Sequence, residues 1–250
     1  METIAIINQK GGVGKTTTAV NLAVALKKYY AKIMLIDMDP QGNAGTHLGV
    51  RADMDNSIGA VLLGEKKIKD IVIRSENIDV VPSNINLSGI EYNIANEIAP
   101  QMLLKDALKD VEYEYEVIVI DSPPSLGLLS VNVLTAADKV IIPVNDYLAM
   151  EGVSALLETI NKVKKKLNGK LDVMGYLVTM KDFTSISNEV LERLQSHFSN
   201  KVLDTTIREN TVLAQAPGYG KSIFEYKKNC NGFKDYEALG EEVYRKINKV

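Results

Sequence analysis

The chain has 250 residues, of which 46% are hydrophobic, and this is enough to bury a sizeable core. Its net charge of -3 gives no overall basic character, so any nucleic-acid-binding surface has to be local. A single cysteine, Cys230, excludes a disulfide within the chain and a multi-cysteine metal site, and it fits a reducing compartment.

The amino-terminal residues lack the basic start and the long apolar run of a signal peptide. No apolar run in the sequence is long enough to cross a bilayer. We therefore expect a soluble, cytoplasmic protein that does not insert into membranes.

Short apolar runs alternate with helical patterns along the chain. Helical patterns cover residues 16–30, 151–167 and 233–250, whereas residues 40–77, rich in Gly, Asn and Asp, form the least regular segment. This alternation predicts one α/β domain over residues 1–250, built on a mostly parallel, twisted sheet with helices on both faces. The runs predicted as strands are Thr3–Ile7, Ile33–Asp37, Ile78–Pro82, Val117–Asp121, Lys139–Val144 and Val173–Thr179.

A glycine-rich turn follows the first predicted strand and opens the first predicted helix. Its glycines let backbone N–H groups curl around an anion, and the helix N-terminus adds the positive end of its dipole. Lys15 would reach the β- and γ-phosphates of a nucleotide, and the Thr16 hydroxyl would hold Mg²⁺. The strict P-loop pattern is not met, because Gln9 stands where that pattern has glycine; Lys10 comes next. The residues predicted to bind the nucleotide are Gly11, Gly12, Val13, Gly14, Lys15, Thr16 and Thr17.

Aspartates stand at the ends of two predicted strands, at the edge where open α/β sheets bind ligands. Asp121 ends one strand and is predicted to lie on the Mg²⁺ side of the site. Asp37 ends another strand, and alternation predicts that Asp37 and Asp39 point the same way, toward the phosphates. One of them could orient water for attack on the γ-phosphate, although any single aspartate here could instead cap a following helix.

Four stretches, "KGGVGKTT", "LIDMDPQGNA", "VIVIDSPPSLG" and "PVNDYLAMEG", together resemble the ParA/Soj partition ATPases. These belong to the deviant Walker A class of P-loop proteins, with MinD and the nitrogenase iron protein as relatives. The resemblance runs from Thr3 to the C-terminal helical pattern, and "DPQGNA" favours ParA/Soj within the class. It implies a P-loop NTPase fold, ATP and Mg²⁺ as cofactors, and hydrolysis of ATP to ADP and phosphate.

The resemblance also implies a role for each residue of the site. Lys10 would reach across an ATP-dependent homodimer to the nucleotide of the other subunit, so that two ATP molecules lie between two chains. Lys15 and Thr16 would hold phosphate and Mg²⁺, Asp121 would be the Walker B group, and Asp39 would position the hydrolytic water. Lys10, Lys15 and Asp39 are therefore the expected catalytic residues.

The family binds DNA without sequence preference, acts with a ParB/Spo0J-like centromere-binding partner, and associates with the nucleoid. Two arginine positions of its usual pattern are here Phe183 and Val212. Other basic residues could replace them, because phosphate contacts need only positive charge at suitable spacing. The candidates for DNA contact are Lys181, Lys201, Arg208 and Lys221.

Other functions remain in competition. A MinD-like positioning ATPase would act on a membrane or a protein cargo, but the polar positions of the last helical pattern include Asp235, Glu237, Glu241 and Glu242. An electron-transfer ATPase needs two cysteines per subunit, and only Cys230 is present. A small-molecule kinase has no need of Lys10.

Overall fold

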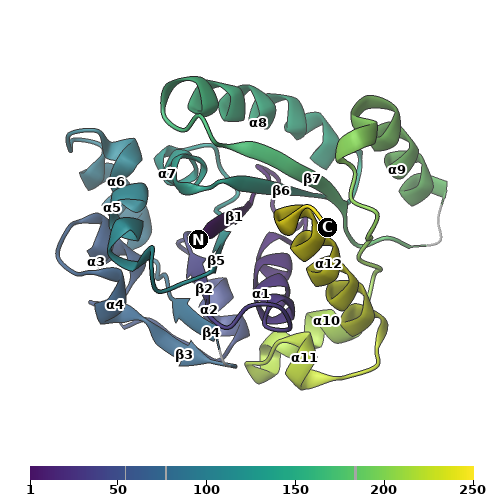
Figure 1. The fold of residues 1–250 in the computed structure, drawn as a ribbon, viewed down its shortest axis with the longest axis horizontal. Helices are drawn as coiled ribbons and strands as arrows, with labels where there is room; N and C mark the ends of the chain where they lie inside the picture. The colour runs from purple at the N-terminus through teal and green to yellow at the C-terminus, as the bar shows by residue number, and fades with distance from the viewer. Residues whose placement is uncertain (54, 77, 183–184) are drawn as a thin grey trace.

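The computed structural model describes residues 1–53, 55–76, 78–182 and 185–250 (Figure 1). Within these residues, seven strands form one sheet in the order β3-β4-β2-β5-β1-β6-β7. Neighbouring strands are parallel except β3 and β4, which are antiparallel. The strands are β1 (Glu2–Ile6), β2 (Ile33–Asp37), β3 (Ile73–Ser75), β4 (Ile78–Val81), β5 (Val117–Asp121), β6 (Lys139–Val144) and β7 (Asp172–Val178).

Helices connect the strands and cover the sheet. The α-helices are α1 (Lys15–Leu26), α2 (Asn43–His47), α3 (Ile58–Leu62), α4 (Ile68–Ile71), α5 (Leu87–Ile94), α6 (Leu103–Leu108), α7 (Leu128–Ala136), α8 (Tyr147–Lys166), α9 (Ser185–Phe198), α10 (Thr211–Gln215), α11 (Ile223–Tyr226) and α12 (Asn231–Asn248). Short 3-10 segments are η1 (Pro100–Met102), η2 (Lys109–Val111), η3 (Ser199–Lys201) and η4 (Ala216–Tyr219).

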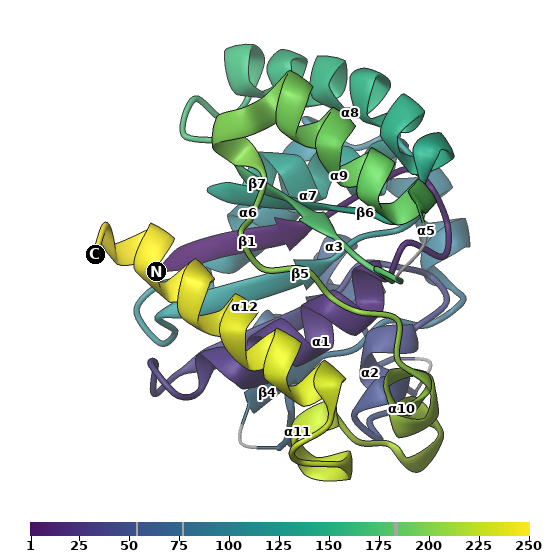
Figure 2. The same ribbon diagram turned by 90° about the vertical axis from the view of Figure 1, so that its right-hand side faces the viewer.

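The sheet separates two hydrophobic clusters, because successive side chains of a strand point to opposite faces. Ala5 lies in the cluster that α3 to α9 complete. Ile4 and Ile6 lie in the other cluster, with side chains of α1, α2, α11 and α12. Figures 1 and 2 show α12 lying along α1 on this second face. The predicted mostly parallel sheet with helices on both faces is confirmed.

Two elements differ from their sequence-based predictions. The edge strand β3 was not expected, since it lies in the segment taken as irregular and exposes Ile73 and Arg74. Helix α8 begins at Tyr147, before the predicted start, because Asp146 caps it by accepting a hydrogen bond from the Ala149 N–H. Short exposed strands and helix caps leave little hydrophobic pattern in a sequence, so both escaped detection.

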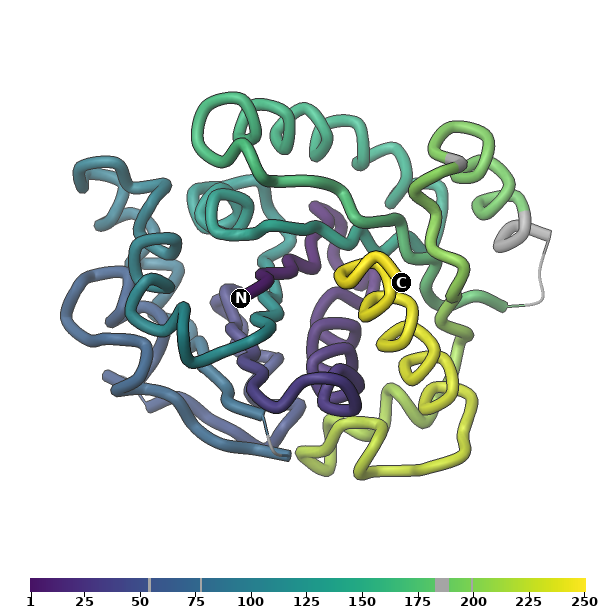
Figure 3. Tube along the Cα trace, viewed as in Figure 1, coloured from purple at the N-terminus to yellow at the C-terminus, as the bar shows by residue number. Residues whose placement is uncertain are grey.

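Parallel pairing brings the carboxyl ends of the central strands to one edge. Asp37 of β2 pairs in register with Asp121 of β5. Figure 2 shows both chain termini near the start of β1, whereas α2 and α10 lie toward the end at which the β1 arrow points. The tube view in Figure 3 follows the chain from β1 directly into α1 at that far edge. The glycine-rich loop therefore lies where ligands bind in open α/β sheets.

Candidate active site

The loop between β1 and α1 has the backbone that an anion site requires. Gly12 and Gly14 have φ values of 77° and 82°, in the left-handed region that glycine adopts without strain. Gly14 directly precedes the first residue of α1. Val13 is fully buried, and its carbonyl oxygen accepts a hydrogen bond from the Thr179 hydroxyl at 2.9 Å. The buried Val13 thus anchors the loop to the protein interior, while Gly11 and Gly12 are exposed to solvent.

Lys15 starts α1 and is only 6% exposed. Its ammonium donates a hydrogen bond to the Lys10 carbonyl oxygen at 2.9 Å. Burial lowers the pKa of Lys15 from its ordinary value, and the charges of Asp121 and Asp39 oppose this shift. A buried ammonium that donates to a backbone carbonyl oxygen is well placed to exchange it for a phosphate.

Thr16 and Asp121 meet beside Lys15. The Thr16 hydroxyl donates to Asp121 Oδ2 at 2.6 Å. Asp121 is fully buried, and within the described chain its Oδ1 atom has no hydrogen-bond partner. A hydroxyl and an unsatisfied carboxylate oxygen are the hard donors that Mg²⁺ and its water ligands prefer. These residues therefore fit the ion that the sequence implied.

Asp37 has a structural environment that differs from the prediction. It is fully buried and accepts hydrogen bonds from the N–H groups of Asp39 and Ala44, each at 2.9 Å. Burial raises the pKa of Asp37 to about 7, against these hydrogen bonds. The expectation that Asp37 points toward the phosphates is wrong: it organises the turn into α2, the capping role that the sequence left open. The pKa of Asp121 is also raised well above its ordinary value; burial is the largest cause, and the charge of Asp37 is the second.

Asp39, in contrast, lines an open cavity of about 380 Å³ over the glycine-rich loop. Every predicted nucleotide-binding residue except the buried Val13 contributes to this cavity. Other residues of the lining were not predicted. The lining comprises Gly11, Gly12, Gly14, Lys15, Thr16, Thr17, Asp39, Gln41, Asn43, His47, Pro124 and Met180.

The signal for some of these missed residues was present in the sequence. Gln41 and Asn43 follow Asp39 in the "DPQGN" stretch, and His47 lies four residues after Asn43, on the same side of α2. His47 is half-buried, and burial lowers its pKa to about 4, so its ring is neutral near pH 7. The cavity therefore offers neutral hydrogen-bonding groups beside Asp39.

A second cavity, of about 260 Å³, adjoins the first and shares Gly14, Thr17 and Met180 with it. The surface of this second cavity is largely apolar, and its further residues come from α10, from α12, from the end of β7 onward and from the segment before α10. A narrow apolar cleft beside a phosphate loop can hold an aromatic ring. The additional residues of this lining are Thr179, Ile207, Arg208, Glu209, Asn210, Thr211, Leu213, Ala214 and Tyr236.

Lys10 lies at the exposed, amino-terminal end of the glycine-rich loop, in the surface hollow that also contains Leu148; we call this surface the rim. Lys15, in contrast, is buried. The Lys10 ammonium forms an ion pair with Asp146 Oδ2 at 2.5 Å. A Cβ atom added at the neighbouring Gly11 would meet nothing within 4 Å. The apolar side chain of Leu148 is 66% exposed and lines the same surface hollow as Lys10. The rim is thus an open face with a lysine and exposed apolar area.

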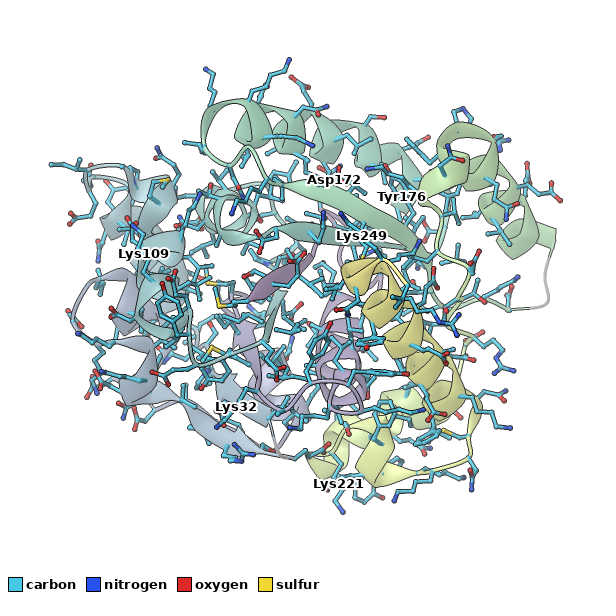
Figure 4. All side chains as sticks on the ribbon, viewed as in Figure 1. Lys32, Lys109, Asp172, Tyr176, Lys221 and Lys249 are labelled. Carbon is cyan, nitrogen blue, oxygen red and sulfur yellow. The ribbon has the colours of Figure 1, made fainter. Side chains whose placement is uncertain are left out.

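The candidate DNA contacts do not form one cluster. Lys181 and Arg208 are neighbours, because their backbones form an isolated parallel β-bridge. Lys201 lies elsewhere, and its ammonium donates a hydrogen bond to Asp172 at 3.0 Å. Figure 4 places Asp172 beside β7 and Lys221 beside α11, on opposite sides of the view. Phe183, one of the substituted family positions, lies outside the described residues.

Two of these four charges are already paired within the chain. The Arg208 guanidinium donates to the Asp235 carboxylate, and Asp235 is 7% exposed. Lys201 is paired with Asp172, as described above. An arginine in such a pair is less available to a phosphate. Lys181 and Lys221 are therefore the stronger candidates of the four.

The predicted core-facing stripe of the C-terminal helix is confirmed. Tyr236, Leu239 and Val243 of α12 are buried in the cluster that contains α1, and Ile247 packs against its edge. Among the residues that the structure describes, no helix is both long enough and apolar enough to span a membrane. The apolar stripe of α12 is covered by the protein itself.

Comparisons with known proteins identify relatives of this chain. A family model described as an AAA domain matches residues 1–173. The sporulation initiation inhibitor protein Soj of Bacillus subtilis is 44% identical over 245 residues, covering 96% of this chain and 97% of that protein. The chromosome partitioning protein ParA of Myxococcus xanthus is 42% identical over 248 residues, covering 97% and 88% respectively.

Solved structures show the same fold. Cobyrinic acid a,c-diamide synthase from Mycobacterium smegmatis, with bound ATP analog and magnesium, is 32% identical with a TM-score of 0.87, covering 99% of this chain and 96% of that one. A putative plasmid partition protein from Borrelia burgdorferi B31, bound to AMPPNP, is 27% identical with a TM-score of 0.84, covering 100% and 99%. With its glycine-rich loop, two lysines and strand-end aspartates in place, the chain belongs to the Soj/ParA family of partitioning ATPases.

Proposed function

We propose that this protein is an Mg²⁺-dependent ATPase that partitions DNA, acting as an ATP-bound dimer. The observation that carries the proposal is the arrangement of the two lysines: Lys15 is buried in the phosphate loop, and Lys10 stands on the open rim. One lysine suffices for the chain's own nucleotide, so the second is available to another subunit. The family membership supports the same conclusion.

The residues fit ATP with Mg²⁺. Lys15 and the loop N–H groups bind the phosphates, and the base enters the apolar cleft beside Gly14 and Thr17. Thr16 and Asp121 hold the ion, whose positive charge neutralises the phosphate oxygens when bound. The ATP analog and magnesium bound to the similar Mycobacterium smegmatis protein support this assignment.

Asp39 orients the water for hydrolysis. It lines the phosphate cavity, and one of its oxygens accepts the Gln41 N–H at 3.0 Å, which fixes the carboxylate's direction. A carboxylate oxygen of Asp39 can accept a hydrogen bond from the attacking water. The reaction then yields ADP and phosphate by in-line displacement.

Two chains associate through the rim. Leu148 is 66% and Met180 45% exposed, and Gly11 leaves space for the backbone of another subunit to approach. Each Lys10 then meets the phosphates bound by the partner subunit, so association depends on ATP. Hydrolysis removes the γ-phosphate contacts and lets the dimer separate.

The dimer binds nonspecific DNA on the nucleoid, and a ParB/Spo0J-like protein stimulates its slow hydrolysis. Lys181 and Lys221 are the basic residues favoured for phosphate contact. Dimerisation doubles each basic surface, so DNA affinity rises with ATP-dependent association. The partition proteins among the relatives support this assignment of biological role.

The test measures association and DNA binding together. Sedimentation of the full chain with ATP, ADP or no nucleotide should show dimers only with ATP, and random-sequence duplex DNA should bind only under that condition. Lys10→Ala should remove both the dimer and the DNA binding, while Lys162→Ala, an exposed lysine of α8 paired with Glu158, should leave both intact. An ATP-dependent dimer that persists in Lys10→Ala would contradict the cross-subunit role of Lys10. An ATP-dependent dimer that does not bind the duplex would contradict the proposed role in partition.

A further inference from the structure

Asp146 has two tasks in the described structure. It follows β6 and caps α8, where its Oδ1 atom accepts the Ala149 N–H at 2.9 Å. Its Oδ2 atom accepts the Lys10 ammonium at 2.5 Å. The two oxygens are thus divided between a helix end and a lysine that lies 136 residues away in the sequence.

The ion pair lies at the rim and is partly exposed to solvent. The side chains of Lys10 and Asp146 are 29% and 36% exposed. Burial opposes the charge on Asp146, but hydrogen bonds from Lys10 and the Ala149 N–H outweigh it and hold the pKa of this carboxyl below its ordinary value. The carboxylate is therefore charged at neutral pH and restrains the lysine.

The same loop links this pair to the phosphate site. Lys15 donates its ammonium to the carbonyl oxygen of Lys10, so both lysines are held by oxygens of the chain itself. When Lys15 turns to a bound phosphate, the Lys10 carbonyl loses that donor. Residue 10 then keeps two restraints among the described residues: its N–H donates to Asn8 Oδ1 at 3.1 Å, and its ammonium is paired with Asp146.

We propose that Asp146 is a specificity-determining residue that holds Lys10 within its own subunit until an ATP-bound partner supplies a stronger anion. The proposal rests on the dimer proposed above. Lys10 must exchange the carboxylate for the partner's phosphates, and the triphosphate offers more negative charge than the diphosphate. Asp146 therefore weakens every dimer, and it suppresses the ADP-bound and nucleotide-free dimers to a level below detection.

The substitution Asp146→Asn separates the two tasks of this residue. Asparagine keeps a side-chain oxygen for the Ala149 N–H, so α8 remains capped. It removes the charge that holds Lys10. Glu158→Gln is the matched control, because it removes one negative charge and one ion pair from the same helix without contacting Lys10. Equal unfolding curves for both variants and the original chain would establish that the fold is unchanged.

The first readout is the dimer dissociation constant from sedimentation, with AMPPNP and with ADP. Breaking one partly exposed pair shifts an equilibrium by about twofold to fivefold, so two pairs per dimer should tighten association by about tenfold. In Asp146→Asn, dimers should also become detectable with ADP. Unchanged or weaker association, or the same gain in Glu158→Gln, overturns the proposal.

The second readout does not require a dimer. In the nucleotide-free chain, acylation of Lys10 by acetic anhydride, followed by mass spectrometry, reports how far its amine is shielded. Asp146→Asn should speed the labelling of Lys10 by about twofold to fivefold and leave Lys162 unchanged. Equal labelling of Lys10 overturns the proposal. If Asp146→Asn speeds the labelling but the original chain forms no ATP-dependent dimer, Asp146 does restrain Lys10, and it is the proposed dimer that is wrong.

Discussion

Two lysines five positions apart in the sequence have opposite environments in the structure. Lys15 is 6% exposed and begins α1, whereas Lys10 lies at the rim in an ion pair with Asp146. Left-handed glycines between them turn the chain sharply enough to separate the two ammonium groups. The difference in burial, not in residue type, suits one lysine to the chain's own phosphate and the other to a partner.

The first residue-scale prediction concerns Asp39. Asp39→Ala should lower the ATP turnover number by at least about 100-fold, because water loses the group that orients it and accepts its hydrogen bond. ATP-dependent dimers should persist, since Lys10 and Lys15 are untouched. Steady-state phosphate release, measured beside sedimentation of the same samples, gives both quantities. A variant that hydrolyses ATP at the original rate would remove Asp39 from the mechanism.

A second residue-scale prediction concerns His47, whose pKa is lowered by burial from 6.5 to about 4. The folded chain keeps this ring neutral, while the unfolded chain takes up a proton below pH 6.5, so the free energy of unfolding falls as the pH drops toward 4. Between neutral pH and pH 5, that loss should be smaller in His47→Gln by about 1 kcal/mol, allowing for partial exposure of the ring.

Urea unfolding at neutral pH and at about pH 5 checks this, in buffers of equal ionic strength. His197→Gln is the control, because His197 is an exposed residue of α9. Identical pH dependence in His47→Gln and in the original chain would show that His47 is not held neutral by the fold.

At the scale of elements, α12 packs closely on α1 through a glycine. A Cβ atom at Gly240 would lie 2.8 Å from the Cβ atom of Ala25 and 3.4 Å from its backbone carbon. Gly240→Ala should therefore lower the free energy of unfolding by about 1–3 kcal/mol, since backbone cannot yield as a flexible side chain does.

Gly89→Ala provides the comparison for this test. Gly89 lies in α5, and an added Cβ there meets nothing within 4 Å. Helix propensity alone should make that variant equal to the original or more stable by up to about 1 kcal/mol. Thermal and urea unfolding of both variants should rank them in this order; a Gly240→Ala chain as stable as Gly89→Ala would mean that the two helices can move apart freely.

Element boundaries show where sequence reasoning stops. The strand runs were predicted nearly in place because continuous apolar residues in a parallel sheet leave a strong pattern. The start of α8 depended on Asp146, which gave no hydrophobic signal, and β3 is a three-residue edge strand with two exposed residues. The phosphate loop was predictable because its residues are contiguous, whereas Thr179 and Met180 reach the site only through the fold.

At the scale of the whole molecule, DNA binding depends on which charges remain available. Lys181→Ala with Lys221→Ala should weaken the binding of random-sequence duplex by the ATP-bound dimer. The slope of log K against log salt should fall by about 1 for each DNA phosphate that the variant no longer neutralises. Fluorescence anisotropy across a salt series measures both the affinity and the slope.

Lys201→Ala is the control for this prediction, because Asp172 and the Val173 carbonyl already hold the Lys201 ammonium. It should change the affinity and the slope little. If Lys201→Ala weakens binding as much as the double variant, the pair with Asp172 must open on DNA and the choice among the four basic residues is wrong.

The sequence alone determined the fold class and the family, because apolar strand runs and a contiguous phosphate motif are local patterns. The single domain over residues 1–250 and the role of each site residue remain predictions. Only the tertiary structure decided that Asp37 supports the turn while Asp39 faces the cavity, and that Lys10 meets Asp146. Those outcomes depend on burial and on contacts between distant segments, and linear spacing does not encode either.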